Sequence, residues 1–155
     1  MGKITFKEMD IDDIELMSGS LRPIDATEFR VMSGGKSHIE NLTHLLNSSR
    51  RSRAAYYDGE LLAVYGVISP TILNLVGNPW LAATDLIDRP DVRRAFVEET
   101  HKQFAWATDG FKTLWNVVSK ENKVAIRWLK WMGFLFDGTE YEISGHKFVK
   151  FEMEI

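Results

Sequence analysis

The stretch that decides the fold is NKVAIRWLKWMGF, residues 122–134. Its apolar side chains recur at helical spacing and share one face. They are Ala125, Trp128, Leu129 and Met132. Gly133 stands where a helix commonly ends, and Phe134 begins an apolar run suited to a strand. The stretch therefore predicts an amphipathic helix followed at once by a β-strand.

The segments before this helix alternate in type. Residues 113–118 predict a strand, and Ser119 can cap a helix over about 120–132. A longer helix begins near Asp88 and Pro90, which suit an N-cap and a first turn, and ends at 109–110. Before it, residues 80–84 form a short apolar run that predicts a central strand.

The first half of the chain predicts a strand, several helices and a hairpin. Residues 3–8 alternate polar and apolar as a half-buried strand does. Helical segments follow over about 10–17, 23–32 and 36–46, and an arginine-rich stretch over 48–53 ends the last of them. Two apolar runs, 54–57 and 61–68, flank Asp58-Gly59, which is a strong hairpin signal. Strands over 134–136 and 147–153 complete the prediction.

Composition limits the classes of protein. The 155 residues suit one domain over 1–155, and 45% hydrophobic residues can build its core. A net charge of -3 gives no strong signal for nucleic-acid binding, and the absence of cysteine excludes disulfides and thiolate metal sites. We expect a soluble chain with no signal peptide and no membrane span.

The element order predicts an α/β (α+β) fold, with a mixed, mostly antiparallel sheet of about six to seven strands flanked by helices. In this order, residues 122–134 resemble the last helix of the GNAT acyltransferases, whose pattern is Asn-x-x-Ala-x-x-x-Tyr-x-x-x-Gly-Phe. The matching residues are Asn122, Ala125, Gly133 and Phe134. The resemblance implies a sheet split between strands four and five, with an acyl-CoA cleft in the split.

A closer resemblance covers almost the whole chain. The segments LRPID (21–25), DGELLAVYGV (58–67), PWLAATDLI (79–87) and 122–134 are together similar to the GNAT-like internal virion protein A family of short-tailed phages. This resemblance implies a role in virion morphogenesis, with other phage structural or core proteins as partners. It also implies a location in the host cytoplasm during infection and in the virion. A homo-oligomer is an open alternative.

The GNAT resemblance also implies which residues would hold acetyl-CoA if the chain were active. They are Leu81, Ala82, Ala83, Thr84, Arg89, Arg94, Asn116 and Asn122. A working GNAT grips the pyrophosphate with backbone N–H groups of a glycine-rich loop at a helix N-terminus. Residues 84–94 contain no glycine, place Pro90 where a donor is expected, and bring three aspartates to the phosphate position. This site is expected to be degenerate.

The general acid of the family is also missing. Leu129 occupies the position of the tyrosine that protonates the departing thiolate, and leucine cannot donate a proton. Tyr141 is the other tyrosine that could be proposed as the acid. The sequence does not give its distance from the cleft, and a surface tyrosine is the expected interpretation. No catalytic residue and no metal site can be assigned, because the four histidines lack ligand spacing.

Several basic and aromatic side chains can be interpreted either as ordinary surface or core residues or as a contact with a partner protein. A basic stripe on the last helix and the arginines of 50–53 could meet an acidic partner, but both are typical of solvated surfaces. Trp128 and Trp131 fit either a core or a protein interface. Two functions remain open: a phage assembly protein that uses the fold as a scaffold, and an active acetyl-CoA-dependent N-acetyltransferase.

Overall fold

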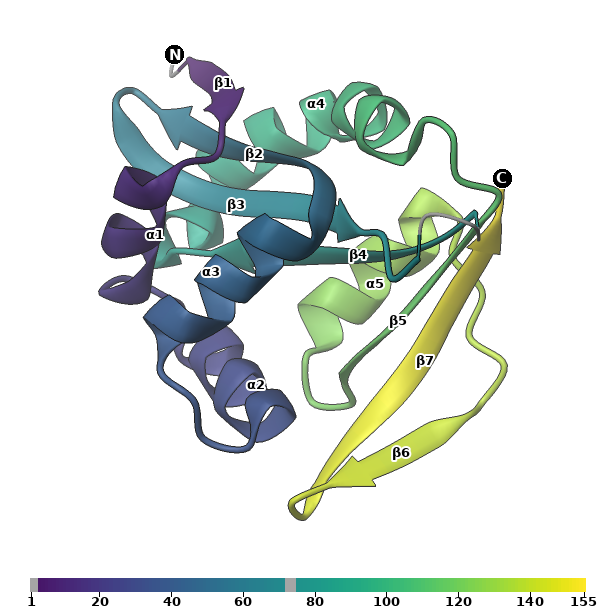
Figure 1. The fold of residues 1–155 in the computed structure, drawn as a ribbon. Helices are drawn as coiled ribbons and strands as arrows, with labels where there is room; N and C mark the ends of the chain where they lie inside the picture. Colours follow the sequence, from purple (N-terminus) through teal and green to yellow (C-terminus); the bar gives the residue numbers. More distant parts are fainter. Residues whose placement is uncertain (1–2, 72–74) are drawn as a thin grey trace.

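The computed structural model describes residues 3–71 and 75–155, which form one seven-stranded sheet in the order β1-β2-β3-β4-β5-β7-β6 (Figure 1). The strands are β1 (Ile4–Glu8), β2 (Ser49–Tyr57), β3 (Glu60–Ile68), β4 (Val76–Ala83), β5 (Thr113–Ser119), β6 (Glu140–Ile143) and β7 (His146–Glu154). All neighbouring strands are antiparallel except β4 and β5, which are parallel. The predicted fold class is confirmed.

Five α-helices and one 3-10 turn cover the sheet. They are α1 (Ile11–Ser18), α2 (Pro23–Ser33), α3 (His38–Ser48), η1 (Asp85–Asp88), α4 (Pro90–Thr108) and α5 (Lys123–Met132). Asp10 and Ser37 form capping boxes at the starts of α1 and α3. Gly34 and Gly133 end α2 and α5 in the left-handed conformation that glycine adopts without strain.

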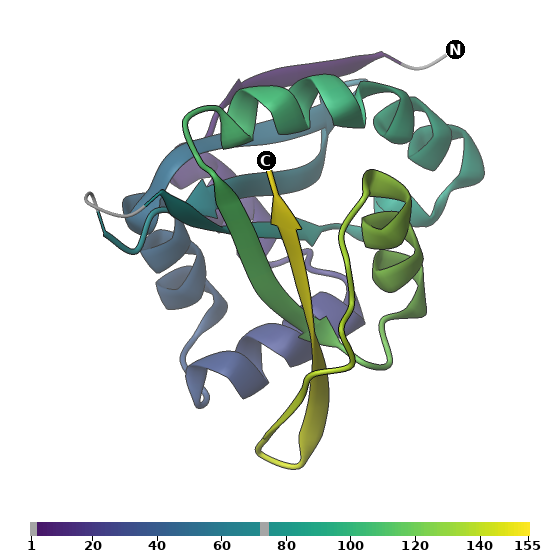
Figure 2. The ribbon, with the colours of Figure 1, turned by 90° about the vertical axis from the view of Figure 1, so that its right-hand side faces the viewer.

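The helices lie on two faces of the sheet. Figure 2 shows α4 above the sheet and α2 and α3 below it. Ile14, Met17 and Leu42 pack on one face, whereas Phe96 of α4 and Leu129 of α5 belong to clusters on the other. The core is therefore two apolar layers separated by the sheet.

Several predicted boundaries are corrected. The strand expected at 54–57 begins five residues earlier, because the polar run over 49–53 is extended and Arg53 stacks 3.6 Å from the ring centroid of Trp106. The strand expected at 80–84 begins at Val76 and includes Pro79. Asn74, the first residue of the NLVGNP segment (74–79) that runs into this strand, lies outside the described residues. Arg89, not Asp88, is the N-cap of α4.

Two corrections concern the last third of the chain. Asn122, not Ser119, caps α5, because its Oδ1 accepts the Ala125 N–H at 3.2 Å. The strand expected at 134–136 is only an isolated bridge between Leu135 and Glu152. The strand beside β7 is instead β6, whose run EYEI alternates polar and apolar residues over only four positions and which the sequence prediction missed. No described helix is long and apolar enough to cross a membrane.

Gly77 pairs with Leu114 in the last backbone pair between β4 and β5, where there is no room for a larger side chain. A Cβ at this position would lie 2.6 Å from Val67 Cγ1 and 2.9 Å from the Phe111 ring. We expect Gly77→Ala to lower the free energy of unfolding by about 1–3 kcal/mol through overpacking. Urea denaturation measures this change.

Gly19→Ala is the control, because the nearest atom to a Cβ there is 4.0 Å away. An unchanged unfolding midpoint in Gly77→Ala would show that Val67 and Phe111 can move aside at little cost.

Candidate functional site

The parallel strands β4 and β5 form a fork. Their backbone pairing is limited to Val76 with Thr113 and Gly77 with Leu114. Beyond these pairs, two side-chain amides bridge the strands: Asn78 Nδ2 donates to Trp115 O at 2.9 Å, and Asn116 Nδ2 donates to Pro79 O at 2.8 Å. Figure 1 shows β5 and β7 running at a steep angle to β3 and β4. The fork is therefore a gap in the sheet.

A cavity of about 1090 Å³ lies at this fork and is lined from both faces of the sheet. Its walls include Phe29 and Met32 of α2, Trp80 and Leu81 of β4, Trp115 of β5 and Trp128 of α5. Side chains do not fill the gap between the two strands. A small molecule can therefore reach the fork edge of β4.

Much of that edge is already engaged by the chain itself. The N–H of Thr84 bonds to Leu62 of β3, so the peptide groups of Ala83 and Leu81 point the other way, toward the fork. At Ala83 both groups are taken. Its N–H donates to Asp25 Oδ2 at 3.0 Å, and its carbonyl accepts the Arg22 N–H at 2.9 Å. A ligand amide can pair with Ala83 only if this contact opens.

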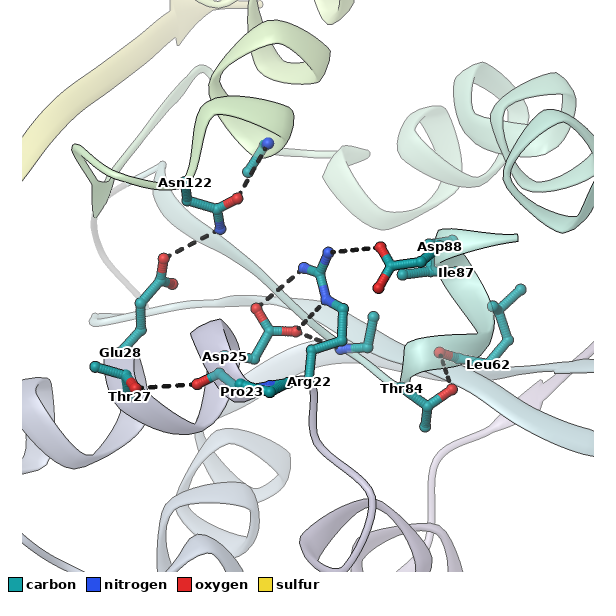
Figure 3. A network of polar contacts seen from close by, with 12 residues as sticks. Arg22, Pro23, Asp25, Thr27, Glu28, Leu62, Thr84, Ile87, Asp88 and Asn122 are labelled. Carbon is teal, nitrogen blue, oxygen red and sulfur yellow. Dashed lines mark hydrogen bonds and ion pairs between the residues drawn. The ribbon is translucent and has the colours of Figure 1, made fainter. Parts of the chain in front are cut away.

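The segment that makes this contact, residues 21–25, is called the strap below. Asp25 is 3% exposed and accepts two bonds from the Arg22 guanidinium, each at 3.1 Å (Figure 3). A bridge between Leu21 and Thr84 extends the pairing to the end of β4. The strap therefore closes one end of the fork with a buried ion pair.

The turn between β4 and α4 is electrically balanced. Asp88 accepts from Arg93 Nη2 at 3.1 Å and lies 3.9 Å from Arg22 Nη1. At the first turn of α4, Arg89 pairs with Asp91 at 2.9 Å, and this bond holds the pKa of the Asp91 carboxyl below its usual range. Each of the three arginines, Arg22, Arg89 and Arg93, therefore has a carboxylate partner. The turn offers little net positive charge to an anion.

Glu28 is a partly buried carboxylate one helical turn along α2 from Asp25, beside the end of β5. Its Oε1 accepts from Asn122 Nδ2 at 3.1 Å (Figure 3). A backbone hydrogen bond from Ser119 also favours the charged form of this carboxylate. Burial raises the pKa of Glu28 to about 7, and the nearby charge of Asp25 raises it further, against these two hydrogen bonds and the Arg22 charge. Glu28 is therefore close to half ionised at neutral pH.

One donor on the cavity wall has no acceptor. Trp128 Nε1 is buried and unpaired within the part of the chain that the structure describes, and Trp128 lines the cavity. A buried N–H without an acceptor costs free energy.

The residues implied for acetyl-CoA do not gather in one place. Leu81, Asn116 and Asn122 line the cavity, although Asn116 bridges the fork and Asn122 caps α5. The other five lie outside its lining: Ala82, Ala83, Thr84, Arg89 and Arg94. The Thr84 hydroxyl donates to Leu61 O at 3.0 Å, and Arg94 is exposed. Their role in binding stays a prediction.

The other candidates are scattered. Leu129 is buried in the core beneath α5, and Tyr141 is exposed on β6. Trp131 is 52% exposed and its ring centroid is 4.7 Å from that of His101. No group of three or more metal-ligating side chains occurs among the described residues.

Sequence reasoning did not single out the strap pair or Glu28. A weak signal existed for Glu28, because it falls on the i, i+4, i+7 stripe of α2 with Ile24 and Val31, where an apolar residue is expected. The strap entered the sequence analysis only as the segment LRPID of the family resemblance, because no local pattern indicates that Arg22 and Asp25 meet the fork edge of β4.

No family model and no curated protein matches this chain. Solved structures do match. A GNAT-family acetyltransferase from Streptococcus pneumoniae is 13% identical, with a TM-score of 0.62 over 99% of this chain and 100% of its own. A spermidine N-acetyltransferase from Vibrio cholerae, in complex with CoA and spermine, is 13% identical, with a TM-score of 0.69 over 97% of this chain and 95% of its own.

The chain has the GNAT fold. A ribosomal L7/L12 alpha-N-protein acetyltransferase, solved with CoA, gives a further match at 9% identity and a TM-score of 0.64, over 98% of this chain and 94% of its own. Identities this low show the shared fold and leave the chemistry open. The resemblance of residues 122–134 to the last GNAT helix therefore agrees with the observed fold.

CoA does not fit this GNAT site well. On the fork edge of β4, the Ala83 peptide groups are engaged by the strap and are not free to pair with a pantetheine amide. The turn where a pyrophosphate would lie contains Asp85, Asp88 and Asp91 and has Pro90 at the first helical position. The arginines of this turn are already paired with its aspartates, so little positive charge is left for a diphosphate, and proline removes a backbone donor.

Proposed function

We propose that this chain is a virion morphogenesis protein of phage origin that uses the GNAT fold as a scaffold, with a degenerate acyl-CoA site. The observation that carries the loss of the cofactor is the engagement of both Ala83 peptide groups by the strap. The phage origin is supported by the four segments over 21–25, 58–67, 79–87 and 122–134.

The proposed partners are other phage structural or core proteins, or further copies of this chain. Support comes from apolar side chains left exposed on α5 and on the segment that follows it. Trp131 is 52% exposed and Leu135 68%. The proposed location is the host cytoplasm during infection and then the virion. Mass spectrometry of purified particles tests this part of the proposal: the chain is expected in the particle, and its absence from particles would contradict an internal virion role.

A second candidate function is an acetyl-CoA-dependent N-acetyltransferase acting on an amine. One observation favours it: the fork is open, with a cavity of about 1090 Å³, whereas a pure scaffold has no need of such a space. The spermidine and ribosomal-protein acetyltransferases that share this fold give the candidate its general class.

Calorimetry with acetyl-CoA separates the two functions. We expect no saturable heat at millimolar acetyl-CoA, because the strap engages the Ala83 peptide groups and the charge-balanced turn leaves little positive charge for the pyrophosphate. A second titration with desulfo-CoA checks that thioester hydrolysis does not hide binding. Saturable binding at micromolar ligand would overturn the scaffold proposal and favour the enzyme.

A further inference from the structure

Helix α5 presents a basic and apolar face to solvent. Its exposed side chains occupy roughly a third of the helix circumference. They are Lys123, Val124, Arg127, Lys130 and Trp131. The helix contains no aspartate or glutamate, and no ion pair within residues 3–71 and 75–155 involves its three cations. Because Val124 is 42% exposed and Trp131 52%, apolar surface lies between these cations, as is typical of a protein contact.

Helix α1 presents an acidic and apolar face. Its exposed side chains on this face lie within about two fifths of the helix circumference. They are Ile11, Asp12, Glu15 and Leu16. Ile11 is 66% exposed and Leu16 54%. Lys7 pairs with the two neighbouring aspartates, Asp10 at 3.0 Å and Asp13 at 2.6 Å. In the described part of the chain, Asp12 and Glu15 have no such cation.

The two faces match in chemistry and in size. Each carries unpaired charges of one sign beside exposed apolar side chains, and the two signs are opposite. At 1.5 Å per residue, the eight residues of α1 are about 12 Å long and the ten residues of α5 about 15 Å. The capping box of Asp10 fixes the start of α1, and the Trp131 ring lies against His101 of α4. Faces that are formed in advance lose little conformational entropy on association.

The two faces cannot meet within one chain. Ile14 and Met17 hold α1 in the apolar layer on one side of the sheet, whereas Leu129 holds α5 in the layer on the other side. Figure 1 shows α1 at the left and α5 to the right of α3. The faces can therefore meet only between two copies. Such a contact is head-to-tail, and it builds either a ring or an open chain of subunits.

We propose that the acidic face of α1 in one copy of this chain docks on the basic face of α5 in the next copy, so that the protein associates with itself head to tail. The carboxylates of α1 then meet the cations of α5, and Trp131 packs on the apolar side chains of α1. The role of this contact rests on the proposed scaffold function, because a repeating contact suits a protein that organises a particle. The contact itself needs no ligand in the fork.

Sedimentation velocity of the whole chain measures this association. Two short helices bury a small area, so we expect a weak contact, with a dissociation constant of about 100 μM in about 50 mM NaCl. The mean mass is expected to rise with protein concentration and to return to that of the monomer in about 500 mM NaCl, because salt screens exposed charges. A chain that stays monomeric up to about 1 mM protein in the low-salt buffer would overturn the proposal.

Charge reversal on either face separates this contact from any other. Asp12→Lys with Glu15→Lys makes the face of α1 basic, and Lys123→Glu with Arg127→Glu makes the face of α5 acidic. Each double variant alone is expected to associate at least about tenfold more weakly, because like charges then meet. An equimolar mixture of the two is expected to restore the association. In the mixture, the two reversed faces match each other and the two unchanged faces still match.

Glu60→Lys with Glu142→Lys is the matched control, because it makes the same change in net charge at exposed positions on β3 and β6. It is expected to associate as the wild type does, and circular dichroism checks that every variant folds. Unchanged association in either double variant, no recovery in the mixture, or equal weakening in the control would overturn the contact. Mass spectrometry of particles tests the scaffold function separately, so failure of this contact and failure of that function give different results.

Discussion

Replacing Asp25 by alanine is expected to lower the free energy of unfolding by about 3–5 kcal/mol. Asp25 is 3% exposed, and its carboxylate holds the Arg22 guanidinium and the Ala83 N–H together. Without the carboxylate, Arg22 keeps a largely buried charge and Ala83 keeps a buried donor without its acceptor. Removing one partner leaves the other charge buried and unpaired. The loss of stability is therefore larger than the net stability that the intact pair contributes.

Urea denaturation measures this effect through the midpoint and slope of the transition. Glu152→Ala is the control, because it breaks a more exposed pair with Lys150 at 3.4 Å and is expected to cost at most about 1 kcal/mol. If Asp25→Ala cost no more than the control, the strap would contribute little to closing the fork.

Glu28→Gln is expected to stabilise the protein at alkaline pH by roughly 2–3 kcal/mol. The pKa of Glu28 is raised from 4.5 to about 7 in the folded chain, so folding favours its protonated form. The contribution of protonated Glu28 to the free energy of unfolding is fully present below about pH 4.5. It decreases as the pH rises and is lost above about pH 7. Glutamine stays neutral throughout and still offers an oxygen to the Asn122 amide.

Paired melting curves from about pH 4.5 to about pH 8.5 test this expectation, because the wild type and the variant are compared at each pH. The difference in stability is expected to be smallest at the acidic end and to grow until about pH 7. Glu99→Gln controls for the loss of one carboxylate. A difference that stays constant with pH would mean that Glu28 titrates near its ordinary pKa.

The sequence by itself determined the fold and most of its elements. The spacing of Ala125, Leu129 and Gly133 predicted α5 and its end, and Asp58-Gly59 predicted the β2–β3 hairpin. These features are local, because helical periodicity and turn residues are set by neighbours a few positions apart. The same reasoning missed β6, whose alternation covers only four exposed or partly buried residues and which is held by pairing with β7.

The sequence also drew attention to the turn over residues 84–94 as the expected weak point of a CoA site, and this stays a prediction. Its aspartates and Pro90 are visible without coordinates, and the structure adds that Arg22 and Arg93 both approach Asp88. The charge balance of this turn could therefore be read only in part, because Arg22 reaches it from a distant segment.

Tertiary structure alone decided the state of the fork. Asp25 meets Ala83 across 58 positions, and Glu28 meets Asn122 across 94. Neither pair has a local pattern, since each forms only when α2 lies against the ends of β4 and β5. The open cavity and the burial that raises the pKa of Glu28 depend on the same packing. Local spacing set the elements of this protein, and contacts between distant segments set what its fork can bind.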